Sequence, residues 1–457
     1  MSRIIGVNEK PTLGKWIPLS FQHVFAMFGA TVLVPFLVTI NTPEHTTMLT
    51  STALFTSGVG TLLYILITKG KVPAYLGSSF AFIAPLISVS TAYGFPYAMG
   101  GAFFVGLIYL AFALIIRSFG LKWLDRVLPP VVIGSIIVAI GLNLAPTAMN
   151  MAMNGSGNTY NLYYVLVAAV TLGIAIVASV ILKGFFTVIP VLIGIIGGYL
   201  FTLVMGWIFP QYAIIDFSAV AAARWFGFTK FALPKFGFVP MATFALVSMA
   251  TIAEHLGDTL VTSKVVGKDF YKDPGLHRTL AGDGLATSLA SLFGGPPNTT
   301  YGENIGVMAI TRVYSVWVIG GAAVIAVLLS FVTKIGALIQ TIPVPVMGGI
   351  SMMLFGIIAS SGIRTLVESG IDYSDKRNLI ISSVILVIGI GGGKLFFPLT
   401  AELNFNLEGI ALAALVGIIL NLVLPQSLNE KPEDGALESS EAKREIKAGT
   451  QEAAVRK

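Results

Sequence analysis

The sequence contains no cysteine among its 457 residues. Disulfides, thiolate metal sites and cysteine nucleophiles are therefore excluded. Charge is also scarce, since only 11% of the residues are Asp, Glu, Lys or Arg, whereas ordinary soluble domains contain roughly 25%. This deficit argues against a water-soluble globular protein.

Motifs of several enzyme classes are missing as well. The chain has no His-Glu-x-x-His zinc site, no Gly-x-Ser-x-Gly nucleophile turn and no Walker motif for ATP. We therefore predict that the protein is not an enzyme, holds no metal or cofactor, and does not use ATP directly.

Apolar sequence, by contrast, is abundant. Hydrophobic residues make up 55% of the chain and the mean hydropathy is +0.85. Runs such as Leu162–Leu182 and Phe186–Phe209 have the roughly 17–25 residues that a helix needs to cross a bilayer. The alternating pattern of a membrane β-barrel is absent. The sequence predicts an all-α membrane protein in contact with lipid, whose first run (16–40) is a span rather than a cleaved signal.

We predict fourteen membrane spans, in two sets of seven. Their ranges are 16–40, 48–67, 74–90, 97–116, 130–146, 162–182, 186–209, 239–261, 279–293, 298–311, 313–332, 344–360, 379–393 and 407–425. The predicted regions are an N-terminal tail (1–15), a first repeat (16–209), an outer connection (210–238), a second repeat (239–425) and a disordered polar tail (426–457).

The basic residues orient these spans. With the N-terminus inside the cell, 17 of the 28 Lys and Arg fall in the inner tail and loops, 5 in outer loops and 6 in the C-terminal tail. This bias follows the positive-inside rule and places both termini in the cytoplasm of a protein in the inner or plasma membrane. The net charge of +6 thus reflects orientation and does not indicate nucleic-acid binding.

Three short matches suggest that the two halves repeat one another. The pairs are Pro130–Gly134 with Pro345–Gly349, Gln22-His23 with Glu254-His255, and Gly77–Phe82 with Thr300–Asn304. Because each repeat has an odd number of spans, the repeats must run in opposite directions through the membrane. Such inverted repeats place a binding site at the midplane, where short interrupted spans meet. Spans 3 and 10 are the short, broken ones here.

Four carboxylates lie within predicted spans: Glu254, Asp258, Asp283 and Glu303. A charged group at membrane depth is costly unless it faces a partner or a cavity. For Asp283 we expect neutralisation by nearby Arg278. Glu254 has no basic residue within helical reach on its span, so we predict that it is functional, together with Glu303. Asp258 could be paired with Lys264, and all three of Glu254, Asp258 and Glu303 are candidates to carry a proton.

The tenth span begins after Gly294–Pro297, a sequence that no helix crosses intact. If spans 3 and 10 are half-helices, their free backbone N–H groups near Phe80 and Gly302 converge on one point. Such donors, with carboxylate acceptors, suit a small planar ligand that alternates C=O and N–H groups. His23 fits either simple packing or a supporting role behind this site.

The motifs that carry these residues resemble those of the nucleobase–ascorbate transporter family. The similar stretches are Gln22-His23, Glu254–Asp258, Asp273–Arg278 and Asn298–Thr311. Within that family the Asn298–Gly306 version is similar to that of bacterial uracil permeases, which are uracil–proton symporters. The resemblance implies fourteen spans in two inverted repeats, with spans 1–4 and 8–11 in a core domain and spans 5–7 and 12–14 in a gate domain.

The resemblance also implies roles for individual residues. Glu254 and Glu303 would bind the substrate ring, the backbone at Phe80 and Gly302 would donate to its carbonyl oxygens, and Ala30 and Tyr301 would line the pocket. Asn304 and His23 would support the site. Asp258 matches a position that is His in some uracil members and acidic in other family members, which leaves the proton-coupling residue open among Glu254, Asp258 and Glu303. Phe355 lies in the span where some relatives place a Tyr against the ligand.

The expected function is therefore uptake of uracil driven by a proton gradient. The resemblance also implies that the transporter forms a homodimer. A xanthine or urate permease of the same family is the main alternative, although such relatives usually carry Gln where this chain has Glu303. An anion exchanger that shares the fold is the third alternative.

Overall fold

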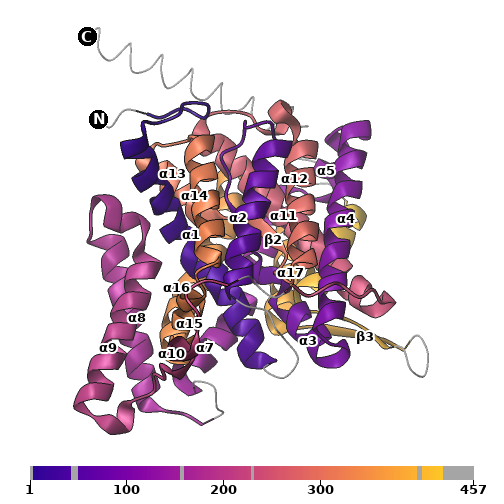
Figure 1. The fold of residues 1–457 in the computed structure, drawn as a ribbon. Helices are drawn as coiled ribbons and strands as arrows, with labels where there is room; N and C mark the ends of the chain where they lie inside the picture. Colours follow the sequence, from indigo (N-terminus) through magenta and orange to yellow (C-terminus); the bar gives the residue numbers. More distant parts are fainter. Residues whose placement is uncertain (1–3, 43–49, 155–158, 228–230, 399–403, 426–457) are drawn as a thin grey trace, which may run out of the picture.

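The computed structural model describes residues 4–42, 50–154, 159–227, 231–398 and 404–425, which form a helical bundle with two small sheets (Figure 1). The predicted disordered tail (426–457) lies outside the described residues. The elements of the first half are α1 (Leu13–Asn41), α2 (Thr50–Ile67), β1 (Leu76–Ser78), η1 (Phe80–Phe82), α3 (Ile83–Tyr93), α4 (Phe95–Phe119), α5 (Lys122–Val127), α6 (Pro130–Asn143), α7 (Ala145–Asn154), α8 (Leu162–Val180), η2 (Gly184–Val188) and α9 (Pro190–Ile208).

A connection with two short turns, η3 (Pro210–Tyr212) and α10 (Ser218–Ala222), leads to the second half. The elements that follow are α11 (Phe238–Val266), the π-turn η4 (Tyr271–Gly275), α12 (Leu276–Leu292), β2 (Asn298–Thr300), α13 (Gly302–Thr311), α14 (Val316–Ser330), α15 (Thr333–Gln340), α16 (Val344–Glu368), α17 (Lys376–Gly391), β3 (Lys394–Pro398), β4 (Asn404–Glu408) and α18 (Gly409–Val423).

Each of the fourteen predicted segments contains a helix. Among the described residues, eight helical stretches are long and apolar enough to cross a membrane. The stretches are α1, α2, α4, residues 130–154, α8, α9, α11 and α16. The four strands were not predicted, and α16 continues to Glu368 rather than ending near residue 360. Polar residues in its last turns concealed this continuation.

Proline and polar caps explain where several helices begin. Pro130 is the first residue of α6 and Pro345 the second of α16, positions at which the missing N–H costs nothing. Asn161 caps α8 by accepting a hydrogen bond from the backbone of Tyr163 (2.9 Å), and Asp375 caps α17 in the same way. These prolines therefore start helices.

The helix contacts are equivalent in the two halves. The neighbours α2 and α14 correspond to α12 and α4, and α1 with α14 corresponds to α11 with α4. In the same manner α8 packs on α9 as α17 packs on α18, and α6 crosses its own counterpart α16. Exchanging these elements with their counterparts thus reproduces these contacts, which is the packing that two structural repeats produce.

The crossing of α6 and α16 is close because it is built on glycine. A Cβ added at Gly362 would lie 2.6 Å from the carbonyl oxygen of Gly134, and one at Gly141 would lie 2.5 Å from that of Phe355. Between helices in lipid, where no hydrophobic force drives association, such close backbone approach supplies van der Waals contact.

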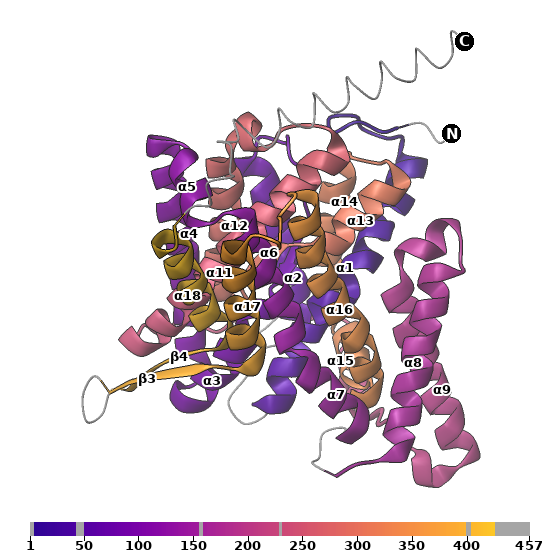
Figure 2. The ribbon, with the colours of Figure 1, turned by 180° about the vertical axis from the view of Figure 1, so that it is seen from behind.

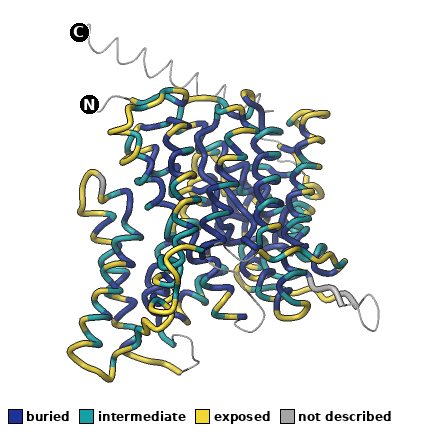
Figure 3. The backbone as a smooth tube through the Cα atoms, viewed as in Figure 1, coloured by how far each residue is buried: buried dark blue, intermediate teal, exposed yellow. Residues whose placement is uncertain are grey.

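Burial is concentrated in the middle of the bundle (Figure 3). The antiparallel pair β1–β2 lies there, and all six of its residues are buried. Helices α8 and α9 stand at one side of the molecule in both ribbon views (Figures 1 and 2). In the connection, Trp225 and Phe226 are 67% and 71% exposed.

Candidate substrate site

A two-stranded ribbon joins the predicted broken spans. Leu76 pairs with Thr300, Gly77 with Thr299 and Ser78 with Asn298. Two further backbone hydrogen bonds of 2.9 Å extend it, from Ser79 N to the oxygen of Pro297 and from Tyr301 N to that of Tyr75. Buried backbone groups must be paired, and the ribbon satisfies them where both spans lack helical hydrogen bonds.

A helix begins directly after each strand of the ribbon. Phe80 starts η1, which continues into α3, and Gly302 starts α13. The first N–H groups of a helix have no acceptor within it and carry partial positive charge. Both half-helix starts border one small cavity of about 50 Å³, whose lining residues are Phe80, Ile137, Glu254, Asp258, Thr299, Thr300, Tyr301, Gly302, Glu303, Ile357, Ile358 and Ser361.

Glu254 and Glu303 face this cavity from different elements. Glu254 comes from the middle of α11 and Glu303 from the first turn of α13. Among the described residues, Oε2 of Glu254 and Oγ1 of Thr299 are buried without a hydrogen-bond partner. Leaving buried polar groups unpaired costs about 1–3 kcal/mol each. Both residues line the cavity, so these atoms lie where a molecule in the cavity can reach them.

Asp258 lies one turn beyond Glu254 on the same face of α11 and also borders the cavity. Its Oδ2 accepts a hydrogen bond from Thr300 Oγ1 at 2.9 Å. Of the two alternatives for Asp258, the pairing with Lys264 is not formed, because Lys264 makes a salt bridge with Glu368 of α16 (3.1 Å). Six residues separate Asp258 from Lys264, which turns the two side chains away from each other on a helix.

Tyr301 borders the cavity, and its hydroxyl forms hydrogen bonds with Ser78 and Thr31 rather than with a cavity-lining residue. The hydroxyl donates to the backbone oxygen of Ser78 (3.2 Å) and accepts from Thr31 Oγ1 of α1 (3.1 Å). Its ring covers Gly77, where a Cβ would lie 2.4 Å from the ring carbon Cζ. Tyr301 therefore ties the ribbon to α1, and Gly77 leaves room for it.

His23 and Asn304 meet behind the cavity, which neither of them lines. The Asn304 side-chain amide lies 3.1 Å from His23 Nδ1 and donates to the backbone oxygen of His23 at 3.1 Å. This contact fastens α13 to α1 one residue after Glu303.

Two other predicted site residues are buried outside the cavity lining. Ala30 is fully buried in α1, beside Thr31. Phe355 packs edge-on against Phe80, with ring centroids 5.6 Å apart. Its helix, α16, instead borders the cavity with Ile357, Ile358 and Ser361, which the sequence patterns did not single out.

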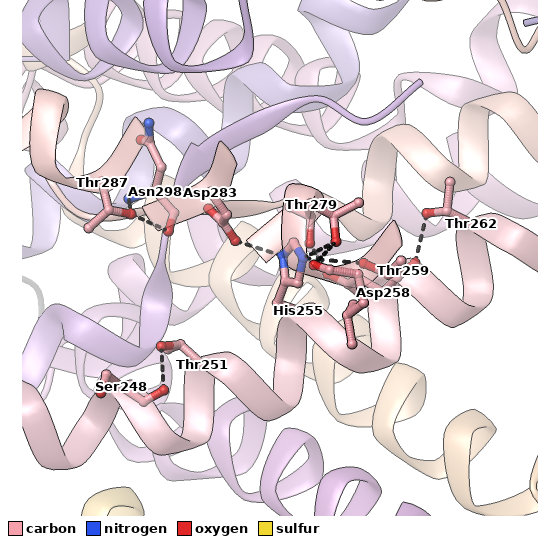
Figure 4. Close-up of polar contacts among 12 residues, drawn as sticks. Ser248, Thr251, His255, Asp258, Thr259, Thr262, Thr279, Asp283, Thr287 and Asn298 are labelled. Atoms are coloured by element: carbon pink, nitrogen blue, oxygen red, sulfur yellow. Dashed lines mark hydrogen bonds and ion pairs between the residues drawn. The ribbon is translucent and has the colours of Figure 1, made fainter. Parts of the chain in front are cut away.

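A buried polar network lies next to Glu254 on α11 (Figure 4). His255 Nδ1 is 2.8 Å from Asp283 Oδ2, and His255 Nε2 is 3.1 Å from Thr279 Oγ1. The expected partner of Asp283, Arg278, is therefore wrong: it lies five residues earlier on α12 and faces another direction. The signal for His255 was present in the sequence, as the second residue of the repeated Gln-His and Glu-His pairs.

Taken together, the cavity is lined by three carboxylates and by the starts of two half-helices. Among the described residues that line it, none is basic. The arrangement can accept hydrogen bonds from ligand N–H groups, donate them to carbonyl oxygens and exchange protons at carboxyl groups. It contains no arrangement for nucleophilic chemistry.

The sequence of this chain is similar to those of known membrane permeases. A family model described as "Permease family" matches residues 14–396. Uracil permease of Bacillus subtilis (strain 168) is 53% identical over 437 residues, covering 93% of this chain and 96% of the relative. Uracil permease of Escherichia coli (strain K12) is 46% identical over 442 residues, covering 96% and 98%.

Solved structures show the same fold at low sequence identity. SLC26A9 superposes with a TM-score of 0.65 at 11% identity, covering 90% of this chain and 66% of that one. The transmembrane domain of the cyanobacterial bicarbonate transporter BicA gives a TM-score of 0.58 at 15% identity, covering 91% and 99%. The permease family match, the permease relatives and the apolar helices thus define a multi-pass membrane permease, a transporter rather than an enzyme.

The chain belongs to the nucleobase–ascorbate transporter family, as its motifs predicted.

Proposed function

We propose that this protein carries uracil into the cell together with a proton, by alternating access. One observation carries the proposal: the unpartnered carboxylate oxygen of Glu254 borders a cavity shared by the starts of η1 and α13. Support for the substrate comes from several relatives named uracil permease, which are 46–53% identical to this chain.

Uracil matches the chemistry of the cavity. Its ring alternates N–H groups with C=O groups, so Glu254 and Glu303 can accept from the ring while the amides at Phe80 and Gly302 donate to its oxygens. The apolar surfaces of Phe80, Ile137 and the α16 isoleucines cover the ring faces. The ligand would be held between elements of both repeats.

Three carboxyl groups are available to carry the proton: Glu254, Asp258 and Glu303. All three border the cavity, so protonation of one can be linked to occupancy by the substrate. The proton gradient would supply the energy, without a cofactor.

The proposed membrane arrangement has fourteen spans, with both termini in the cytoplasm and the protein in the plasma membrane. The core domain would comprise α1–α4 and α11–α14, and the gate domain α6–α9 and α16–α18. Movement of one domain against the other would expose the cavity to each side in turn. The assembly would be a homodimer surrounded by lipid.

Uptake of labelled uracil into proteoliposomes tests the proposal. We expect uptake that increases with an inwardly directed proton gradient and collapses when the gradient is dissipated. Glu254→Gln and Glu303→Gln should each reduce uptake, and the variant that retains binding but loses gradient dependence identifies the proton carrier. Absent uptake, or uptake that ignores the gradient, would contradict the proposal.

A purine permease and an anion exchanger are the alternatives. Competition by xanthine or urate, but not by uracil, would favour the first. The second draws on the structural neighbours, one of which is described as an anion transporter. A cavity with carboxylates and no basic lining residue opposes binding of an anion.

A further inference from the structure

A second, larger cavity of about 430 Å³ lies between α3, the first turns of α11, and the β3–β4 hairpin with the start of α18. We propose that this cavity, here called the outer vestibule, is the passage by which substrate reaches the site from the β3–β4 face. This inference rests on the proposed function, and it adds the route by which the substrate enters and the side chains that close this route.

The vestibule and the site lie on one stripe of α11. Val239, Thr243 and Val247 line the vestibule, whereas Glu254 and Asp258 line the site. Intervals of four and seven residues keep all five on the same helix face. A molecule moving along that face of α11 would therefore pass from one cavity to the other.

The barrier that we assign between the cavities is the pair of rings of Phe80 and Phe355. Phe80 lines the site and the next residue, Ala81, lines the vestibule. Phe355 of α16 packs against Phe80 at 5.6 Å with an interplanar angle of 82° and is 1% exposed. Because Phe80 belongs to the proposed core domain and Phe355 to the proposed gate domain, relative movement of the two domains separates the rings and joins the cavities.

The vestibule suits an uncharged ring rather than an ion. Its charged lining residues are Lys394 and Glu408, which pair with each other at 2.9 Å at the base of the hairpin. The other lining groups are apolar or neutral, such as Ser88, Thr243 and Asn143. Pockets for small organic ligands occupy roughly 300–1,000 Å³, so one nucleobase fits with its hydration water.

The natural absence of cysteine makes the passage testable in the full chain. Ser88→Cys places a thiol on the vestibule wall, and Ser90→Cys, two residues along α3, places one at a fully buried position outside the lining. Tyr160→Cys, at a 61% exposed position, reports that the reagent reaches the protein. A membrane-impermeant thiol reagent is added outside intact cells.

We expect Ser88→Cys and Tyr160→Cys to react and Ser90→Cys to remain unmodified. Modification at Ser88→Cys should abolish most uracil uptake, while modification at Tyr160→Cys should leave it unchanged. Labelling of Ser88→Cys without loss of uptake would overturn the passage, as would failure of Ser88→Cys to react. If none of the unmodified variants takes up uracil, the proposed function fails, whereas the labelling result still stands.

The barrier has its own test. Ser361→Cys places a thiol in the site, beyond the two rings. In combination with Phe355→Ala it should react faster with the external reagent than it does alone, because the vestibule and the site are then joined. Equal reaction rates would overturn the role of Phe355 as a barrier, and the rate at Tyr160→Cys serves as the reference.

Discussion

The salt bridge between Lys264 and Glu368 provides a test of the proposed movement between domains. Lys264 lies in the last turn of α11 and Glu368 ends α16, so under the proposed function the pair connects the core domain with the gate domain. Their charged atoms are 3.1 Å apart, and each side chain is 40% exposed. The pair must separate whenever α11 and α16 move apart at this end.

Because both side chains of the pair are partly exposed, the salt bridge contributes only a small free energy. Ion pairs at exposed positions contribute about 0.2–1 kcal/mol, which corresponds to roughly a 1.4- to 5-fold change in an equilibrium constant. Lys264→Gln should therefore shift the equilibrium between the paired and the separated arrangements of α11 and α16 toward the separated one by that factor. Lys264→Glu should shift it further, because two carboxylates then face each other. Exchange of both charges, with Lys264→Glu and Glu368→Lys, should restore the original balance.

The rate at which a thiol at Thr365→Cys reacts with an impermeant reagent in inside-out vesicles measures this balance. Thr365 is 6% exposed on α16, so it reacts only when the helices separate. Lys268→Gln is the matched control, since Lys268 forms no salt bridge among the described residues. Unchanged reactivity in Lys264→Gln and Lys264→Glu, or failure of the double exchange to restore it, would refute the reasoning. High salt should reduce the effect.

Three further substitutions test the packing, each by the thermal unfolding of the purified protein. Gly362→Ala should destabilise the α6–α16 crossing by about 1–3 kcal/mol through overpacking, while Gly356→Ala, with nothing within 4 Å of the added Cβ, should not; equal effects would contradict the close approach. His255→Ala should cost about 3–5 kcal/mol because it leaves a buried carboxylate without its partner, and a neutral result would mean that the 2.8 Å contact is unimportant. Asn421→Ala removes the side chain that accepts from Arg377 and donates to the backbone of Arg126, both at 2.7 Å, so a loss of about 1–3 kcal/mol is expected; no loss would show that this bridge does not hold α18.

Much of this molecule follows from local sequence. Hydropathy located a helix in every predicted segment, because lipid requires long apolar stretches whose backbone is internally paired. The cost of burying a carboxylate directed attention to Glu254 and Glu303, and the structure brings both to one cavity. The matched Gln-His and Glu-His pairs anticipated the equivalence of α1 and α11.

Other features depend on contacts between distant segments, which a single sequence does not display. The pairing of Gly77 with Thr299 joins residues more than two hundred positions apart, and neither strand is long enough to show a pattern. The partner of Asp283 was assigned to a neighbour in sequence, whereas the folded chain supplies His255 from another helix. The packing of Phe355 against Phe80 likewise joins residues of distant elements.

The β1–β2 ribbon also limits which insertions and deletions this chain can tolerate. Its ladder, from Tyr75–Ser79 to Pro297–Tyr301, sets the spacing between the amides that follow Ser79 and those that follow Tyr301. Shifting the register by one residue would turn every side chain of a strand to the opposite face. Insertions and deletions should therefore be far less tolerated here than in the outer connection, and neither half of the chain, expressed alone, could form the site unless it met its complement and rebuilt the ladder.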